Sequence, residues 1–105
     1  MLGWYIWDGD NVKTVRDMQT WAKQFNGMAN RRVANDRNET VTVTVSTVFL
    51  GVNHQFGNGP PLLFETMVFG GEYDQEQERY STAAEARIGH RQWCEKCGIE
   101  PKSIN

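Results

Sequence analysis

The residues best suited to bind a ligand stand together in one loop, residues 53–61 (NHQFGNGPP), between two hydrophobic segments. His54 could act as a general base or as a hydrogen-bond donor, and Phe56 offers a ring face for stacking. Gly57 and Gly59 would let backbone N–H groups approach a ligand closely. The loop is therefore a candidate ligand-binding site. The alternative is a shaped turn that only reverses the chain and holds a hydrogen-bonded histidine.

Four charged residues could complete such a site. A phosphate group would have to be met by arginines, and Arg31, Arg32 and Arg79 are nearest in the expected topology. Glu65 lies in a segment that is otherwise apolar in both phases, where a carboxylate must find a partner or shift its pKa upward. It is either one member of a structural ion pair or an acid that contacts the ligand. His54 and Glu65 would be the acid–base pair if the protein were an enzyme.

A second motif, His-x3-Cys-x2-Cys, is formed by His90, Cys94 and Cys97. Zinc could use these three side chains, but a structural site needs a fourth ligand from elsewhere. A redox Cys-x-x-Cys usually opens a helix, whereas this one lies at a helix end, where the dipole would raise the thiol pKa. Two reduced thiols near the C-terminus are the preferred interpretation, so we expect no metal, no cofactor and no catalytic residue here.

Two strong strands flank the loop. In the first, residues 40–52, valine and threonine alternate as in a strand with one buried and one wetter face. The phase changes after Ser46, which indicates either a bulge or cover on both faces. The second, residues 62–69, is apolar in both phases, as is typical of a central strand with a helix on one side. In a small chain the other side could be covered by a second subunit, so we expect a homo-oligomer.

The remaining chain predicts short elements around these strands. The helix before the first strand has apolar residues at helical spacing, and the last helix begins with a capping box of Thr82 and Glu85. The N-terminal strand contains Trp4, Tyr5 and Trp7, and these side chains would either pack in the core or stack on a ligand. The expected elements are a strand at 2–7, a hairpin arm at 12–14, a helix at 15–26 capped by Thr14, a strand at 31–35, a surface loop at 72–79 and a helix from Thr82 to Gly98. The expected fold is α+β: an antiparallel four- to five-stranded sheet with two helices packed on one face.

Amino-acid composition and net charge argue against several classes of protein. The chain has 105 residues, of which 39% are hydrophobic and 23% charged, so one soluble domain, 1–105, is expected. The formal net charge of −2 gives a nucleic-acid polymer no global electrostatic attraction. No apolar run approaches the roughly 20 residues of a membrane-spanning helix. The first residues lack the basic and long apolar regions of a signal peptide, so a cytoplasmic protein is expected.

The central segments resemble a group of small phage and prophage accessory proteins. The similarity rests on residues 46–51 (STVFLG), His54, residues 56–57 (FG) and residues 59–71 (GPPLLFETMVFGG), with further matches around Trp21 and in residues 79–90. Asn53 stands where that group more often has an acid, and the cysteine pair is peculiar to this chain. The resemblance implies a phage protein that works in the host cytoplasm. Small accessory phage proteins often counter host defence, either by sequestering a nucleotide signal or by occluding a defence enzyme.

Two functions follow as expectations. The first is a non-enzymatic binding protein that sequesters a small anionic ligand, such as a nucleotide immune signal, between the loops of a homo-oligomer. The alternative is a hydrolase or lyase that acts on a nucleotide through His54 and Glu65, or an inhibitor that blocks a host defence enzyme. The expected ligand-binding residues are His54, Phe56, Gly57, Gly59, Arg31, Arg32, Glu65 and Arg79.

Overall fold

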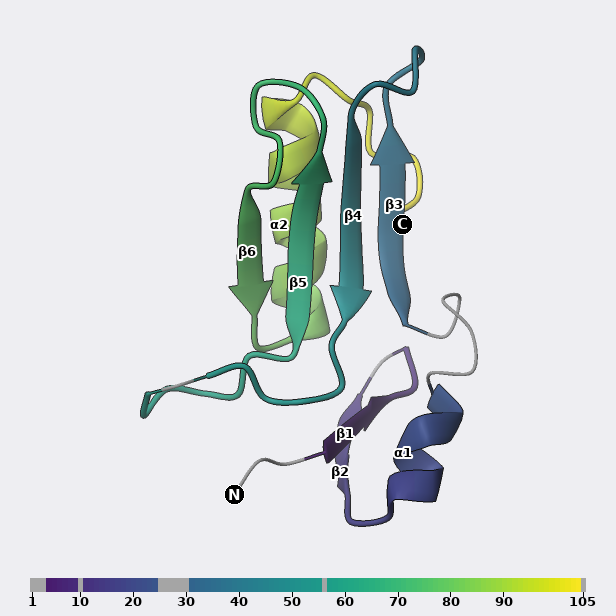
Figure 1. Cartoon of the computed structure of the whole chain (residues 1–105), viewed down its shortest axis with the longest axis vertical. Helices are drawn as coiled ribbons and strands as arrows, with labels where there is room; N and C mark the ends of the chain where they lie inside the picture. The colour runs from purple at the N-terminus through teal and green to yellow at the C-terminus, as the bar shows by residue number, and fades with distance from the viewer. Residues whose placement is uncertain (1–3, 10, 25–30, 56, 105) are drawn as a thin grey trace.

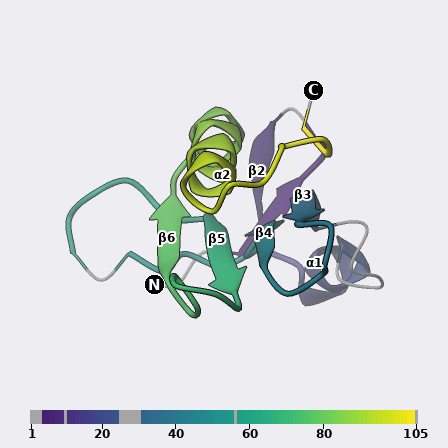
Figure 2. The same cartoon turned by 90° about the horizontal axis from the view of Figure 1, so that it is seen from above.

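The computed structural model describes residues 4–9, 11–24, 31–55 and 57–104. Strands β3 (Arg32–Arg37), β4 (Thr44–Phe49), β5 (Phe64–Phe69) and β6 (Gln77–Tyr80) form an antiparallel four-stranded sheet in that order. Helix α2 (Ala83–Lys96) lies along one face of it (Figures 1 and 2). Strands β1 (Trp4–Trp7) and β2 (Val12–Val15) form a separate two-stranded sheet beside helix α1 (Met18–Gln24). The expected class is confirmed: an α+β fold whose two helices pack against antiparallel sheet.

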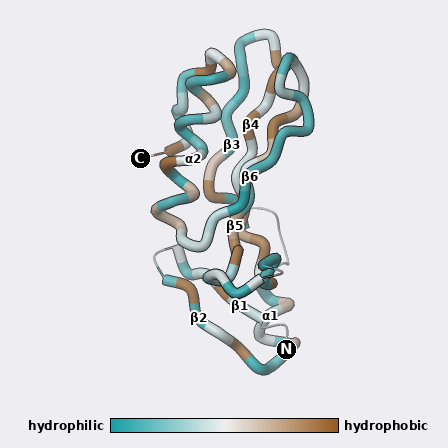
Figure 3. The backbone as a smooth tube through the Cα atoms, turned by 90° about the vertical axis from the view of Figure 1, so that its left-hand side faces the viewer, coloured by the Kyte–Doolittle hydropathy of each residue, from teal (hydrophilic) through white to brown (hydrophobic). Residues whose placement is uncertain are grey.

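The four strands present two different faces. The face under α2 carries the inward residues Ala34, Asp36, Val45, Thr47, Phe49, Phe64, Thr66, Val68 and Tyr80, all of them buried. Since successive side chains in a strand point to opposite sides, the residues between them form the other face. We call that face the open face; its residues are Arg32, Asn35, Arg37, Thr44, Ser46, Val48, Glu65, Met67, Phe69, Gln77 and Arg79. Figure 3 shows α2 on one side of the strands only.

The first long strand of the sequence is shorter than expected. The structure places residues 40–43 in the turn that precedes β4, and Val41 is exposed there with a positive φ of 56°. The predicted change of phase after Ser46 does not occur, because Val45, Thr47 and Phe49 all point to the helix side. The irregularity lies instead in the neighbouring strand, where the register shifts between Arg32 and Ala34. The apparent shift of phase arises because a polar residue, Thr47, occupies a core position.

The segment at residues 72–79 was predicted to be a surface loop, and the prediction is wrong for its last three residues, 77–79. Residues 77–80 form β6, which pairs with β5 from Phe64↔Tyr80 to Met67↔Gln77. The alternation of this strand was hidden because Glu78 and Arg79 are both charged although they point to opposite faces. The prediction that β5 is a central strand is confirmed, since it lies between β4 and β6.

The N-terminal unit follows the predicted hairpin, with Tyr5 opposite Thr14. Thr14 is therefore not the helix cap; Asp17 takes that role and accepts hydrogen bonds from the backbone N–H groups of Gln19 and Thr20. The Trp4 and Trp21 rings stack 5.8 Å apart. The predicted end of this helix at Asn26 lies outside the described residues.

Helix α2 begins where the sequence predicts. Thr82 is the N-cap, and its side chain and that of Glu85 form the complete capping box. The helix buries Ala83, Ala86, Gly89, His90 and Cys94 against the sheet. One apolar cluster joins Trp7, Phe49, Leu63 and Phe64 with the start of the helix, and a second joins Val45, Val68, Cys94 and Ile99 at its end. Among the described residues, no helix is long and apolar enough to cross a membrane.

Candidate functional site

Three of the residues expected to bind a ligand meet on the open face. The registers place Arg32 opposite Val48, Val48 opposite Glu65, and Glu65 opposite Arg79, so the four form one row across β3, β4, β5 and β6. With neighbouring strands about 4.8 Å apart, the row spans roughly 14 Å. Within the part of the chain that the structure describes, this row brings together three expected site residues that lie far apart in the sequence.

The open face is hollowed above this row. A cavity of about 230 Å³ is lined by Arg32, Ser46, Val48, Glu65, Met67 and Phe69. Phe69, the last residue of the central strand β5, is 48% exposed and so offers an accessible phenyl ring. Phe69 lies in register with Thr44, and Thr44 with Arg37. A ligand in the hollow would thus meet an exposed ring and arginines within one surface.

The electrostatics of the open face differ from those of the whole chain. Its strand positions carry three arginines, Arg32, Arg37 and Arg79, against one acid, Glu65, whereas the chain as a whole carries −2. The Arg79 Nε donates to Glu65 Oε2 over 3.0 Å. The ion pair expected for Glu65 is therefore present, and it neutralises one arginine. Arg32 and Arg37 supply the remaining positive charge.

The loop predicted to form the site leaves the sheet at the end where this row lies, because it joins Phe49 to Phe64 (Figure 1). Its neck is closed by Asn53, whose side chain accepts from the backbone N–H groups of Gln55 and Leu62. The His54 backbone N–H donates to the Leu62 carbonyl over 3.0 Å.

The remaining loop residues bond within the loop. The Gly57 N–H donates to the Gln55 side chain, and Gly59 lies against that same side chain. Neither glycine has a positive φ, so neither is required by backbone conformation. Phe56 lies outside the described residues. Arg31 precedes β3, and its carbonyl accepts from the Phe49 N–H over 2.7 Å.

The sheet face under α2 holds polar side chains that sequence reasoning missed. The Asp36 carboxylate bonds to His90 Nε2 over 2.8 Å, and His90 Nδ1 bonds to Thr47 Oγ1 over 2.7 Å. Thr47 Oγ1 bonds to Thr66 Oγ1, which accepts from the Tyr80 hydroxyl over 3.1 Å. Every strand of the four-stranded sheet contributes one side chain. We call Asp36, Thr47, Thr66, Tyr80 and His90 the buried network.

The C-terminal segment completes the buried network. The backbone N–H groups of Lys102 and Ser103 donate to Asp36 Oδ1, and the Ser103 hydroxyl donates to Asp36 Oδ2 over 2.6 Å. Burial alone would raise the pKa of Asp36, but hydrogen bonds from Ser103 and His90 outweigh it and lower the pKa below 3.8. Burial lowers the pKa of His90 below 6.5 in spite of the bond to Asp36, so the imidazole is neutral.

An Asp–His–Thr arrangement resembles the hydrogen-bonded order of a hydrolase triad. Here, however, Thr47 and His90 are fully buried and every bond leads to another protein group. A nucleophile must reach its substrate, so this arrangement holds the helix to the sheet.

A metal ion is the other candidate occupant of this region. The ligand atoms of Asp36, His90 and Cys94 lie within 4.8 Å of one another. Burial, followed by the charge of Asp36, raises the pKa of the Cys94 thiol to about 12, so it stays protonated at neutral pH. A metal would also have to break the hydrogen bonds that join Asp36 to His90 and Ser103. Cys97, the other half of the Cys-x-x-Cys, is only half-buried, and burial raises its thiol pKa as well.

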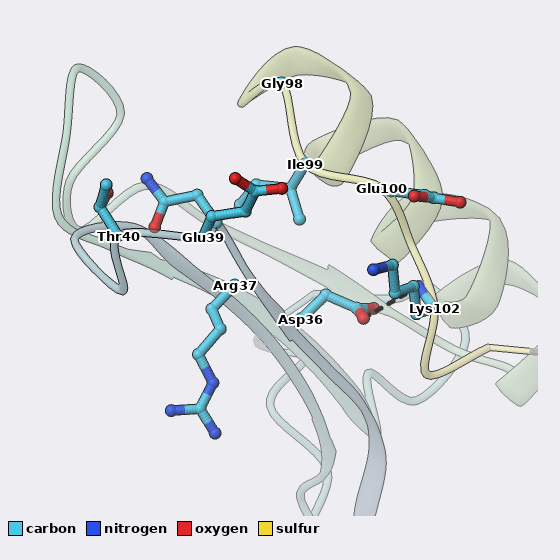
Figure 4. Close-up of a pocket in the computed structure, with 9 residues that line it drawn as sticks. Asp36, Arg37, Glu39, Thr40, Gly98, Ile99, Glu100 and Lys102 are labelled. Atoms are coloured by element: carbon cyan, nitrogen blue, oxygen red, sulfur yellow. Dashed lines mark hydrogen bonds between the residues drawn. The ribbon is translucent and has the colours of Figure 1, made fainter.

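A larger hollow of about 410 Å³ lies between the β3–β4 turn and the C-terminal segment (Figure 4). Asp36, Glu39 and Glu100 line it together with Lys102. Figure 4 shows Arg37 pointing away from Asp36, toward the other side of β3. Arg37 also lines the hollow, and with three acids against Arg37 and Lys102 it favours an anionic ligand less than the open face does.

Comparison with known proteins adds no relative: no protein-family profile, no curated protein and no solved structure matches the chain. The open face, where Arg32 and Glu65 line a cavity and Arg79 pairs with Glu65, is the candidate functional site.

Proposed function

We propose that the protein is a non-enzymatic binding protein that captures a nucleotide or a similar small anionic ligand on the open face and sequesters it. The observation that carries the proposal is that one surface combines net positive charge, a half-exposed phenyl ring and a hollow. Each of these features is costly or unnecessary on a surface that faces only water. Together they match a ligand with a phosphate and a flat ring.

The chemistry of recognition follows from the three residue types. A guanidinium donates two parallel hydrogen bonds to a phosphate, which favours arginine over lysine at Arg32 and Arg37. The Phe69 ring offers a face on which a base can stack, worth about 1–3 kcal/mol per base. Val48 and Met67 give the floor of the hollow an apolar surface that excludes water around these bonds.

The setting is part of the proposal. The resemblance to phage accessory proteins supports a role in the host cytoplasm, where capture of a nucleotide immune signal would blunt host defence. Binding alone is enough for this, provided that the protein is abundant and the complex is tight.

Assembly also belongs to the proposal. Phe69, Met67 and Val48 leave apolar surface on the open face, and a second copy that packs near it would enclose the ligand. Light scattering should therefore give a mass above the 12.0 kDa of one chain. A monomer at micromolar concentration would contradict the proposed oligomer but not the proposed binding site on a single chain.

A nucleotide panel tests the binding function. ADP, GDP, cyclic AMP and cyclic di-GMP are each mixed with the protein, and the unfolding transition is followed. A ligand at one hundred times its dissociation constant stabilises a protein by about 2.7 kcal/mol, which is readily seen. The complex is then heated and the released ligand is analysed by chromatography. Intact ligand supports sequestration, whereas a converted product supports the enzyme alternative.

Variants separate the open face from the rest of the chain. Arg32→Ala and Phe69→Ser should each weaken binding by about 1–3 kcal/mol, the scale of a lost charge-assisted hydrogen bond or stacked base. Arg16→Ala is the matched control, because Arg16 is an exposed arginine outside the sheet. Binding that survives both open-face variants would place the site elsewhere, and His54→Ala then tests the loop. If no nucleotide binds the native protein, a surface that blocks another protein becomes the better explanation.

A further inference from the structure

The acid at the centre of the open face has a geometry that its ion pair does not fully explain. Glu65 lies between Arg79 on β6 and Val48 on β4, and it lines the hollow. Its Oε2 accepts from Arg79 Nε over 3.0 Å. Among the described residues, its other oxygen, Oε1, has no hydrogen-bond donor. Only 16% of the Glu65 side chain is exposed, and because Glu65 lines the hollow, a ligand there can reach this oxygen.

An acid in this position opposes simple anions. A carboxylate that faces the same hollow as Arg32 repels any phosphate that enters, and repulsion between like charges is strongest where water is scarce. The same oxygen forms strong hydrogen bonds with O–H or N–H donors, because the acceptor is charged. Glu65 therefore disfavours phosphate alone and favours a phosphate-bearing ligand that brings its own donor.

We propose that Glu65 is the specificity-determining residue of the open face and selects nucleotides through a ribose hydroxyl or an exocyclic amino group. This inference rests on the proposed function, since it concerns the same site. A site whose acceptor pairs with a donor of the ligand discriminates against an analogue that lacks this donor, because the bound analogue shields the acceptor from water and leaves it unpaired. Phosphate held by Arg32 and a base on Phe69 would bring the ribose or the base edge toward β5.

The test removes donors from the ligand and the acceptor from the protein. The tightest-binding member of the panel of ADP, GDP, cyclic AMP and cyclic di-GMP is compared with its analogues. Each analogue lacks one donor: the 2′-hydroxyl, the 3′-hydroxyl where it is free, or the exocyclic amino group. Binding is measured by calorimetry to the native protein and to Glu65→Gln, which keeps an acceptor for Arg79.

We expect one donor deletion to weaken binding to the native protein about tenfold and to weaken binding to Glu65→Gln less than twofold. Inorganic sulfate, an anion without donors, should compete several-fold better against the variant than against the native protein. The opposite signs of the two effects cannot arise from a merely structural role, which would weaken both ligands together.

Each of the other outcomes tests either the role of Glu65 or the proposed function. If no donor deletion weakens binding to the native protein by more than twofold, Glu65 does not select the ligand, although the site still binds nucleotides. Equal loss in the native protein and in Glu65→Gln assigns the donor to another acceptor and also overturns the inference. If Glu65→Gln fails to fold, binding of the analogues to the native protein still decides whether affinity depends on one donor of the ligand. If no nucleotide binds, the proposed function falls and this inference falls with it.

Discussion

The two faces of the four-stranded sheet both carry charged and polar side chains, but these side chains have different surroundings. On the helix side, Asp36, His90, Thr47, Thr66 and Tyr80 form a chain of hydrogen bonds in which each polar group has a protein partner. On the open face, Arg32, Glu65 and Phe69 surround a hollow. An acid occurs in both places. Asp36 accepts four hydrogen bonds, whereas the bond to Glu65 comes from one arginine.

The polar residues on the helix side stabilise the fold, whereas we propose that those on the open face bind a ligand. A buried polar group without a partner costs about 1–3 kcal/mol, so a complete network specifies how the helix docks on the sheet. Polar groups beside an exposed ring contribute little to folding and are available for binding. Substitutions should therefore divide sharply between the faces, with loss of stability on one and loss of binding on the other.

The largest effect is expected at Asp36. Asp36→Ala would leave His90, Ser103 and two backbone N–H groups without their acceptor, at a cost of about 1–3 kcal/mol for each buried donor that loses its partner. Chemical denaturation measures the loss. Asp17→Ala is the matched control, because Asp17 also accepts several hydrogen bonds but is exposed at the start of α1. Equal losses for the two variants would contradict the importance of the buried network.

A smaller loss is expected at Gly89, where α2 passes closest to Tyr80. A Cβ there would collide with the Tyr80 hydroxyl and ring. Gly89→Ala should therefore cost about 1–3 kcal/mol through overpacking, although alanine is the better helix former. Gln92→Ala, an exposed change in the same helix, should be neutral or stabilising. A Gly89→Ala variant as stable as the native protein would mean that the helix can move away from Tyr80 without breaking the network.

The neutral His90 gives stability a pH dependence. Its folded pKa lies below 6.5, so the unfolded chain takes up a proton first as the pH falls. The contribution of His90 is fully present above about pH 6.5 and decreases below it, and Asp36 adds a further decrease below about pH 3.8. Unfolding measured from pH 8 to pH 5, with NMR of the two histidine rings, checks this. A His90 signal that titrates at or above 6.5 would show that the imidazolium is favoured instead.

The smallest effect on stability is expected on the open face. Phe69→Ser changes a side chain that is 48% exposed, so only about half of the ring area returns to water, and the free energy of unfolding should fall by no more than about 1 kcal/mol. The same substitution should lower nucleotide affinity, as proposed above. A large loss of stability in the ligand-free protein would mean that Phe69 is buried in solution, as it would be at an interface between two copies.

The sequence predicted the framework well because its local signals are strong. The capping box at Thr82, the hairpin before α1 and the central position of β5 all depend on neighbouring residues or on simple alternation. β6 was missed because charged residues hid its alternation. The strand at residues 40–52 was predicted to begin too early, because Val41 continues the valine–threonine pattern into the turn before β4.

The candidate site could be predicted only in part. Arg32, Glu65 and Arg79 were identified from charge and expected topology, and the strand registers place them in one row. Phe69 was not among the predicted site residues, since a strand that is apolar in both phases does not show which of its faces lacks a helix. The buried network was not predicted, because the bond between Asp36 and His90 joins residues 54 apart. An aspartate inside a strand, where it is rarely found, is the signal that could have drawn attention to it.

The link between Asp36 and Ser103 also sets an order of events during synthesis. Asp36 is synthesised before the groups that satisfy its carboxylate, which are supplied by α2 and by Lys102 and Ser103. Until those residues emerge from the ribosome, β3 carries an acid that the core cannot accept without its partners. The buried network therefore cannot be complete before Ser103 has left the ribosome.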